Sequence, residues 1–522
     1  MKARPSDVAP TPSEVASQLV DGLRAFSVTS HPAAMARMCV YALPRYGLTP
    51  AAAILGAGIV WGDLPALIDA DGVVTYRQLA SATGRLATAL SPLIGRRVGL
   101  MAEDDRSLLI ALGAAGLSGA KIWLLNPRMG TEDLEACLAE NHIESVIHSP
   151  DCASRLAGFA GAKIQTSSFA GLIAATPPGA MVPHNAKASQ FVMMTSGTTS
   201  VPVSIPVLRR WASPLPAFAL AGATGVRHGR PTLVCAPMFH GYGLSCALLC
   251  LISGSPLLVS SVCRAEGMAQ MNKGHEARLD WGKAIFDVAT RHGVYTIFAV
   301  PAQLSSLAKY LATERPQRLP SECVVRILSG ADRLDEQTIR ILEGRWGPVV
   351  ANYYGTTESG TVTMIAGVDL AKRPASLGRP VAGARLRIVG DEATVQPCGT
   401  LGRIQLASPL ASVGPTRGWR AWFTTNDVGW VDADGYLYLE GRVGDVVRMG
   451  GEFVSLRRVE SVLTGVDGVT WARAGVISDA TMGQRVVVDI RCATSVDTSI
   501  LRDIVRLRLG PAAVPSRISV LT

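Results

Sequence analysis

The stretch FVMMTSGTTSVPVS, residues 191–204, decides how the rest of the chain is interpreted. Residues 191–194 are apolar and predict a short buried strand. This strand leads into a loop of hydroxyl-bearing and small residues, which are Thr195, Ser196, Gly197, Thr198, Thr199 and Ser200. Gly197 lacks a Cβ, so the backbone can approach an oxyanion closely while N–H groups and hydroxyls donate to it. The pattern indicates a phosphate-binding loop, although one such loop alone is more often a polar surface turn, and the Gly-Lys-Ser/Thr ending of a Walker loop is absent.

Strands and helices alternate on the N-terminal side of this loop. Short apolar runs predict strands at residues 64–69, 98–101, 121–125 and 145–148. Between them, Thr75 and Gln78 form a capping box for one helix, residues 107–117 predict a second, and Thr131 is expected to cap a third. The alternation indicates a layered α/β fold with largely parallel strands.

The same alternation continues on the C-terminal side of the loop. Further strands are predicted at residues 232–236, 295–300, 324–328 and 349–353, and each ends in small or polar residues. Because ligands bind at the carboxyl ends of strands in open α/β sheets, these endings and the loop predict a single site. Beyond residue 380, short strands with glycine turns predict a β-rich subdomain, and residues 446–522 predict a small α+β unit.

Composition sets broad limits on the function. With 522 residues, 48% hydrophobic and 17% charged, the chain is long enough for two or more cored domains. The net charge of +9 is spread along the chain without a basic run, which argues against nucleic-acid binding. The ten cysteines show no metal-binding spacing, and the N-terminus is polar and Pro-rich without a signal peptide, so a cytoplasmic protein with reduced thiols is expected.

Two stretches require a check for membrane contact. Residues 231–263 carry no charged side chain apart from a protonatable His240, but glycines and prolines divide them, so we interpret them as buried core. Residues 1–60 predict a helical N-terminal extension, which could act as a lid; contact with a membrane surface is a less favoured alternative.

Several motifs, taken together and in order, resemble those of the adenylate-forming enzymes: acyl-CoA synthetases, adenylation domains of peptide synthetases, and luciferases. The similar stretches are TSGTTSVPVS at 195–204, PMFHGYG at 237–243, NYYGTTE at 352–358, ASLGRP at 375–380 and the long run at 423–460. Each is weak alone, but their common order makes the resemblance strong. It implies an AMP-binding domain at residues 61–444 and a small, mobile, truncated α+β domain at 445–522, with a hinge at Asp445.

The resemblance also implies a reaction. An acid–CoA ligase of this kind joins a carboxylate, a fatty acid among the candidates, to the α-phosphate of ATP with Mg²⁺, and then transfers the acyl group to coenzyme A or another thiol. The implied nucleotide-binding residues are Thr195, Ser196, Gly197, Thr198, Thr199, Gly330, Ala331, Asn352, Tyr353, Tyr354, Asp427 and Arg442. The implied catalytic residues are His240, Thr357 and Glu358, and Glu358 is also the expected metal ligand.

Within that resemblance the implied roles differ from residue to residue. Tyr354 is expected to stack on adenine, and Asp427 to accept both ribose hydroxyls. Thr357 is expected to bind the α-phosphate. His240 is expected to stand at the gate of the acid and CoA tunnel, whereas a lone histidine is more often a satisfied core residue.

Departures from the family pattern bear on the rate. Val203 stands where the phosphate loop of the family has a lysine, and Ser200 stands where it has a second glycine. The family closes with a catalytic lysine, whereas no lysine follows Lys372 in this sequence. Because one preorganised stabiliser of transition-state charge is worth about 100- to 1,000-fold in rate, slow adenylation is expected. Two alternatives stay open: an enzyme that performs only the transfer of acyl-adenylate to a thiol, and a non-catalytic binder of nucleotide or acyl-CoA.

Overall fold

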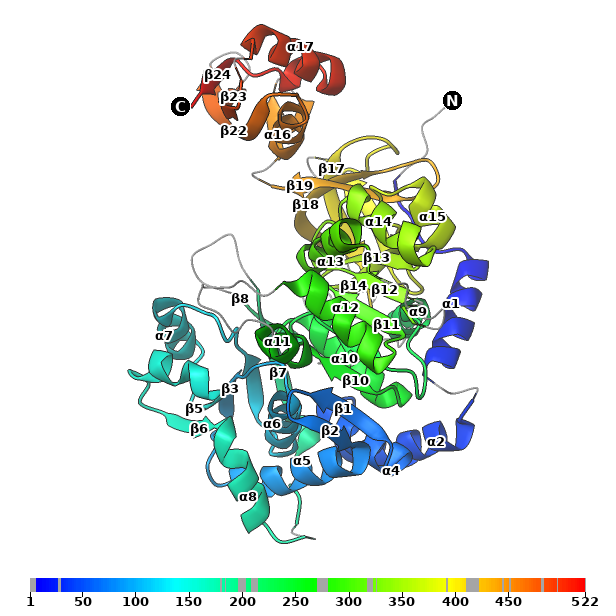
Figure 1. Ribbon diagram of the computed structural model, residues 1–522, viewed down its shortest axis with the longest axis vertical. Helices are drawn as coiled ribbons and strands as arrows, with labels where there is room; N and C mark the ends of the chain where they lie inside the picture. The colour runs from blue at the N-terminus through cyan, green and yellow to red at the C-terminus, as the bar shows by residue number, and fades with distance from the viewer. Residues whose placement is uncertain are drawn as a thin grey trace.

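The architecture comes from a computed structural model, which describes residues 6–26, 30–178, 181–183, 185–195, 203–207, 215–269, 280–316, 323–324, 326–390, 393–409, 422–443, 446–449, 452–479, 483–494 and 496–521. Two large sheets with helices around them form the lower part of the molecule in Figure 1, a smaller sheet follows, and a separate unit lies at the top. The expected layered α/β fold, with a β-rich subdomain and a small C-terminal domain, is confirmed.

The first sheet carries the strand of the phosphate loop. Its order is β6 (Ala162–Gln165), β5 (Ser145–His148), β3 (Arg97–Met101), β4 (Lys121–Leu124), β7 (Gln190–Thr195) and β8 (Val203–Val207). All neighbours are parallel except β7 and β8, which are antiparallel. Its helices are α5 (Tyr76–Leu90), α6 (Arg106–Leu117), α7 (Thr131–Glu140) and α8 (Phe169–Ala175).

Local capping explains where the helices of this layer begin. The predicted capping box is present in α5, where Thr75 and Gln78 bond reciprocally. Thr131, by contrast, is the first residue of α7 and not its cap, because Gly130 takes the N-cap position without a side-chain bond. Glu132 and Asp133 in the first turn place negative charge at the positive end of that helix.

The second sheet has nine strands and a parallel centre. Its order is β15 (Arg379–Pro380), β14 (Gly360–Ala366), β13 (Val350–Thr356), β12 (Arg326–Ser329), β11 (Thr296–Ala299), β9 (Thr232–Val234), β10 (Leu257–Val259), β1 (Pro65–Asp69) and β2 (Gly72–Thr75). Its helices are α9 (Leu215–Thr224), α10 (Gly241–Ser253), α11 (Ser260–Ala269), α12 (Trp281–His292), α13 (Pro301–Glu314), α14 (Glu336–Trp346) and α15 (Gly367–Lys372). Strands β1 and β9 to β13 run parallel, as predicted.

Strand β13 is longer than its sequence indicated. The prediction ended it at Tyr353, but it continues through Tyr354 and Gly355 to Thr356. The reason is tertiary pairing, since β14 folds back antiparallel and pairs Tyr354 with Thr363. The NYYGTTE motif is therefore divided between a strand and the turn that follows it.

One apolar core joins the two sheets. Buried side chains of both contribute, among them Leu100 and Phe191 from the first sheet and Val234 and Phe298 from the second. Helix α10 lies in this core and is apolar on all sides, which is typical of a helix surrounded by protein. Residues 231–263 are thus core, as interpreted from the sequence, and no helix among the described residues is long and apolar enough to cross a bilayer.

The N-terminal residues pack against several parts of the molecule. The helices are α1 (Pro12–Ala25), α2 (Pro32–Arg37), a π-helical turn at Met38–Ala42, α3 (Leu43–Tyr46) and α4 (Pro50–Trp61). Helix α1 lies along α9, with Phe26 and Phe218 rings 4.9 Å apart, and α4 is buried in the shared core. Val8 forms a bridge with Leu386 at the edge of the third sheet.

The third sheet and the C-terminal unit complete the fold. The third sheet has the antiparallel order β16 (Arg385–Val389), β17 (Gly402–Ala407), β18 (Phe423–Val431) and β19 (Leu437–Arg442). The C-terminal unit has β20 (Val446–Met449) paired with β21 (Glu452–Ser455), the sheet β22 (Val469–Asp479), β23 (Gly483–Cys492) and β24 (Arg517–Val520), and helices α16 (Leu456–Thr464) and α17 (Thr498–Leu509). It has its own apolar core, and Ser455 Oγ donates to the Glu440 carbonyl of β19 over 3.0 Å.

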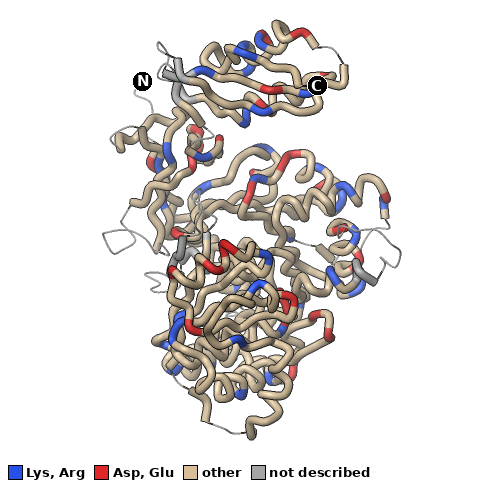
Figure 2. The backbone as a smooth tube through the Cα atoms, turned by 90° about the vertical axis from the view of Figure 1, so that its left-hand side faces the viewer, with Lys and Arg blue, Asp and Glu red and all other residues tan. Residues whose placement is uncertain are grey.

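Charged residues are dispersed over the molecule. In the view of Figure 2, Lys and Arg positions are interspersed with Asp and Glu positions over the visible face. The net charge of +9 is therefore not gathered on one element of that face, in agreement with the dispersion of charge along the sequence.

Candidate functional site

Strand β12 ends at the centre of the candidate site, beside its parallel neighbour β13. Ser329, the last residue of β12, pairs with Asn352 of β13, and Gly330 and Ala331 follow directly. Ser329 and Asn352 are buried, and within the described part of the chain neither Ser329 Oγ nor Asn352 Oδ1 has a hydrogen-bond partner. Buried polar atoms without partners are uncommon in folded proteins, so these two are suited to groups supplied by a ligand.

The opposite face of β13 forms a packed aromatic wall. A Cβ on Gly330 would meet the Tyr353 ring at 1.8 Å, so only glycine fits there. The Tyr353 ring packs on Tyr242 of α10, with centroids 5.0 Å apart, and the Tyr242 hydroxyl donates to the carbonyl of Leu328. This wall fixes the end of β12 and the middle of β13 against the buried helix.

Tyr354, Asp427 and Arg442 come together although they lie far apart in the sequence. The Tyr354 hydroxyl donates to Asp427 Oδ2 over 2.6 Å, and Arg442 Nε lies 3.5 Å from Asp427 Oδ1. Asp427 in β18 and Arg442 in β19 are cross-strand partners, which explains their proximity. Tyr354 and Asp427 are each 8% exposed, whereas the Arg442 side chain is 57% exposed.

The electrostatics of this trio follow from burial. Burial raises the pKa of Tyr354 well above its usual value, and the negative charge of Asp427 raises it further. The tyrosine hydroxyl therefore stays a donor at neutral pH. An ionised carboxylate has about four acceptor positions, so Asp427 can accept from Tyr354 and still receive ligand hydroxyls.

The turn after β13 holds the two remaining residues of the motif. The Thr356 N–H donates to Ser359 Oγ over 3.1 Å, and the Ser359 N–H donates to Thr356 Oγ1 over 3.2 Å. These bonds close the turn around Thr357 and Glu358, which are both half-buried. The structure thus places both residues directly beyond the strand that carries Asn352 and Tyr354.

The phosphate loop is described only at its two ends. Thr195 is the last residue of β7 and pairs with Val203, the first residue of β8. Ser196, Gly197, Thr198 and Thr199 lie outside the described residues, as does Asp445. The loop is therefore framed by an antiparallel pair at an edge of the first sheet.

His240 lies at the N-terminus of α10, between the two sheets. It is the N-cap residue of that helix, and its ring is 4.4 Å from the ring of Phe239. The next residue, Gly241, abuts Met193 of β7: a Cβ there would be 3.1 Å from the Met193 sulfur. The residue is exposed at the surface, yet nearby protein atoms displace enough water to lower the pKa of His240. His240 thus stands beside the strand of the phosphate loop rather than in the core.

Sequence reasoning missed two residues of this region. The Ser329 hydroxyl lies beside Asn352 and has no hydrogen-bond partner among the described residues. Its position immediately before Gly330-Ala331 was the sequence signal that could have identified it. Tyr242 follows His240 by two residues, and only the packing of α10 shows that it supports Tyr353.

These residues fit the nucleotide and the Mg²⁺ ion that the sequence implied. Asn352 Oδ1 is a buried acceptor for an amine, and Asp427 is an acceptor beside a partly exposed arginine. Among the described residues no three His, Cys, Asp or Glu side chains cluster as metal ligands. Mg²⁺ commonly takes only one or two carboxylates together with substrate phosphates, so the single Glu358 fits such an ion.

Comparisons with known proteins identify relatives of this chain. A family profile described as "AMP-binding enzyme" matches residues 59–414. A feruloyl-CoA synthase of Amycolatopsis is 26% identical over 464 residues, covering 85% of this chain and 89% of that protein. A 2-succinylbenzoate–CoA ligase of Listeria monocytogenes is 23% identical over 463 residues, covering 86% and 90%. Both relatives are named as acid–CoA ligases or synthases, the class that the motifs implied.

Solved structures share the fold. The o-succinylbenzoate CoA synthetase of Bacillus subtilis, in complex with its acyl-adenylate intermediate, has a TM-score of 0.74 at 22% identity, covering 90% of this chain and 94% of that one. The amide bond synthetase of Marinactinospora thermotolerans has a TM-score of 0.71 at 22% identity, covering 90% and 95%. Because the family profile spans more than half of the sequence and the strand ends carry the expected residues, the chain belongs to the family of AMP-binding enzymes.

Proposed function

We propose that this protein is an AMP-forming acid–CoA ligase. The main support is the contact of Tyr354 and Arg442 with Asp427. On the same strand as Tyr354, the buried Asn352 Oδ1 has no hydrogen-bond partner among the described residues. The chain also matches the AMP-binding profile. The first half reaction forms a bond between a carboxylate oxygen and the α-phosphorus of ATP and releases pyrophosphate. In the second, the sulfur of a thiol, coenzyme A in the first instance, replaces AMP on the acyl carbon.

The nucleotide-binding residues follow from their chemistry. Asp427 accepts the ribose hydroxyls and Arg442 contacts the same sugar. Tyr354 presents its ring to adenine, while Asn352, Gly330 and Ala331 line the base. Tyr353 packs behind Gly330 and holds this wall of the nucleotide site in place. The loop from Thr195 to Thr199 donates to the β- and γ-phosphates.

The residues beyond β13 act on the reacting phosphate. Thr357 donates to an α-phosphate oxygen, and Glu358 holds Mg²⁺, which offsets phosphate charge when bound. His240 borders the passage for the acid and the thiol. We also propose that residues 61–444 form the nucleotide-binding domain and residues 445–522 the mobile small domain.

The test is pyrophosphate release across a panel of aryl, short-chain and fatty acids with MgATP, followed by acyl-CoA detection after CoA is added. Release that depends on both acid and ATP, and that is lost in Glu358→Gln, supports the proposal. Folded protein that binds AMP but releases no pyrophosphate with any acid of the panel contradicts it.

A second candidate is the transfer half reaction alone. It is favoured by Val203, an apolar residue paired with Thr195 at the mouth of the phosphate loop, where the family carries a lysine. Acyl-AMP plus CoA would then give acyl-CoA, while ATP plus acid would give nothing. Formation of acyl-CoA from acyl-AMP at the same rate with and without the protein would exclude this candidate.

A further inference from the structure

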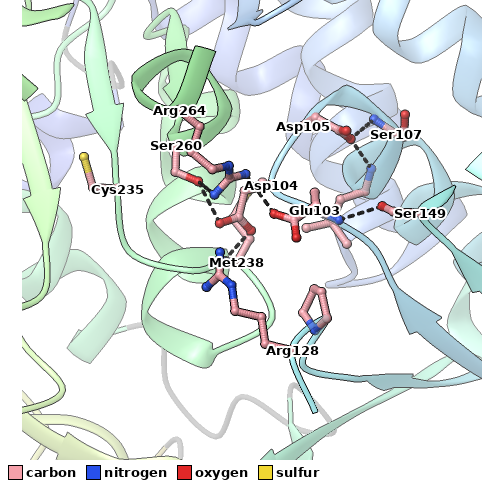
Figure 3. Close-up of polar contacts among 12 residues, drawn as sticks. Glu103, Asp104, Asp105, Ser107, Arg128, Ser149, Cys235, Met238, Ser260 and Arg264 are labelled. Carbon is pink, nitrogen blue, oxygen red and sulfur yellow. Dashed lines mark hydrogen bonds and ion pairs between the residues drawn. The ribbon is translucent and has the colours of Figure 1, made fainter. Parts of the chain in front are cut away.

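A buried carboxylate outside the nucleotide site links the two large sheets. Asp104 follows β3 of the first sheet and is 5% exposed. Its Oδ1 accepts the Met238 N–H over 2.9 Å, and its Oδ2 accepts the Ser260 hydroxyl over 3.0 Å. Met238 lies in the turn after β9 and Ser260 begins α11 directly after β10, so both donors lie on segments that follow strands of the second sheet (Figure 3).

The segment that Asp104 holds is the turn that presents His240. In this turn the His240 N–H donates to the Pro237 carbonyl over 3.2 Å, and the Leu244 N–H donates to the His240 carbonyl over 3.1 Å. The turn is tightly packed at Gly243, because a Cβ there would lie 2.3 Å from the Pro237 carbonyl oxygen. Met238 is fully buried and lies two residues before His240, so fixing its N–H fixes the base of the turn.

Charged groups from several elements surround this carboxylate. Arg264 of α11 donates to Ser260 Oγ over 3.0 Å and pairs with Glu103 over 3.0 Å. Asp104 lines a cavity of about 270 Å³ together with Arg128, after β4, and the thiol of Cys235, after β9. Burial raises the pKa of Asp104 to about 6, while its hydrogen bond from Met238 and the charge of Arg264 act in the opposite direction.

These contacts have one common consequence. We propose that Asp104 is a positioning residue for His240: its carboxylate crosses between the sheets, holds the Met238 N–H, and so sets where the imidazole stands beside the phosphate-loop strand. The proposal rests on the role given to His240 in the proposed function. It assigns Asp104 no contact with substrate.

The chain offers two substitutions and a matched control. Asp104→Asn keeps an oxygen for the Met238 N–H but carries no charge, whereas Asp104→Ala removes the acceptor. Asp105→Ala changes the neighbouring carboxylate, which caps α6 through the N–H groups of Ser107 and Leu108. Thermal melting of all three full-length variants identifies any that fail to fold.

The readout does not need activity. The chain has 14 methionines and eight histidines, so selective labelling resolves the Met238 amide and the His240 ring by NMR, assigned with Met238→Leu and His240→Gln. In the wild type the Met238 amide signal should titrate with a midpoint near pH 6, as Asp104 takes up its proton. That transition should vanish in Asp104→Asn, and the His240 ring signal should shift in Asp104→Ala but not in Asp105→Ala.

Kinetics supply the second readout. Ligation by Asp104→Ala should fall between about 10- and 100-fold, in kcat rather than in KM for ATP, since a small displacement of a residue that positions the reactants has effects of that size. Asp104→Asn should restore most of the rate at pH 7.5.

An unchanged His240 signal in folded Asp104→Ala would overturn the proposal, and so would Asp104→Asn being as slow as Asp104→Ala. If Asp104→Ala does not fold, the Asp104→Asn variant decides the question. A Met238 amide signal that still titrates near pH 6 in that variant would overturn the proposal. A wild type inactive with every acid would refute the proposed function but leave the NMR result to decide the position of His240.

Discussion

Asp427 and Asp104 are both buried carboxylates near strand ends, yet the fold satisfies them differently. Asp427 accepts from one tyrosine hydroxyl and faces Arg442, whose side chain is 57% exposed. Asp104 has a protein donor on each oxygen and is 5% exposed. A carboxylate that accepts from one hydroxyl and faces a half-exposed arginine keeps acceptor positions for ligand hydroxyls, whereas one whose two oxygens each accept from a buried protein donor is suited to hold the chain.

The largest expected effect is the loss of AMP affinity on substitution of Asp427, the carboxylate suited to bind a ligand. Asp427→Ala removes an acceptor for two hydroxyls, so AMP affinity should fall about 100- to 1,000-fold, given the value of hydrogen bonds to charged groups. Calorimetric titration with AMP measures it. 2′,3′-Dideoxy-AMP is the control, since it lacks the hydroxyls and should bind wild type and variant alike; an equal loss for both ligands would contradict the role of Asp427.

The next largest effect lies on the structural side and depends on pH. The pKa of Asp104 is about 6 in the folded protein against 3.8 in the unfolded chain, so the folded state binds more protons between these values. Stability due to Asp104 therefore decreases as pH rises from about 4 to about 6, by at most about 3 kcal/mol. The melting temperature of the wild type minus that of Asp104→Asn should be larger at pH 4.5 than at pH 7.5. A difference in melting temperature that is the same at both values would show that Asp104 does not titrate in this range.

A third test concerns the wall behind the nucleotide site. In Gly330→Ala the new Cβ would meet the Tyr353 ring at 1.8 Å, so the variant should lose about 1–3 kcal/mol of stability and also bind AMP more weakly. Gly344→Ala in α14 is the matched control, because nothing lies within 4 Å of a Cβ there. That control should be stabilised by up to about 1 kcal/mol through helix propensity. Denaturant unfolding compares the two, and equal stability would remove the argument for tight packing at Gly330.

The smallest effect should come from Tyr354→Phe. The ring stays while the bond to Asp427 is lost, so AMP affinity should fall about 3- to 10-fold, the range for one hydrogen bond. Tyr354→Ala, which removes the ring as well, should bind AMP more weakly than Tyr354→Phe in the same titration. Equal affinity for the two variants would show that the ring does not contact the base.

The site could be predicted from the sequence to the extent that its residues lie in continuous motifs. Asn352, Tyr354, Thr357 and Glu358 share one stretch, and the structure places them on one strand and the turn that follows it. Asp427 and Arg442 share another stretch and become cross-strand partners. Ser329 was missed because its burial without a partner is not visible in a sequence.

By itself the sequence determined the family, the alternation of strands and helices, and the buried character of residues 231–263, because these depend on local pattern and the order of motifs. Only the tertiary structure decided that β13 extends to Thr356, that Tyr354 bonds to Asp427 across 73 residues, and that Asp104 reaches Met238 across 134. The last two contacts join separate sheets. Their partners are chosen by strand pairing and packing over long distances along the chain, which no local pattern encodes.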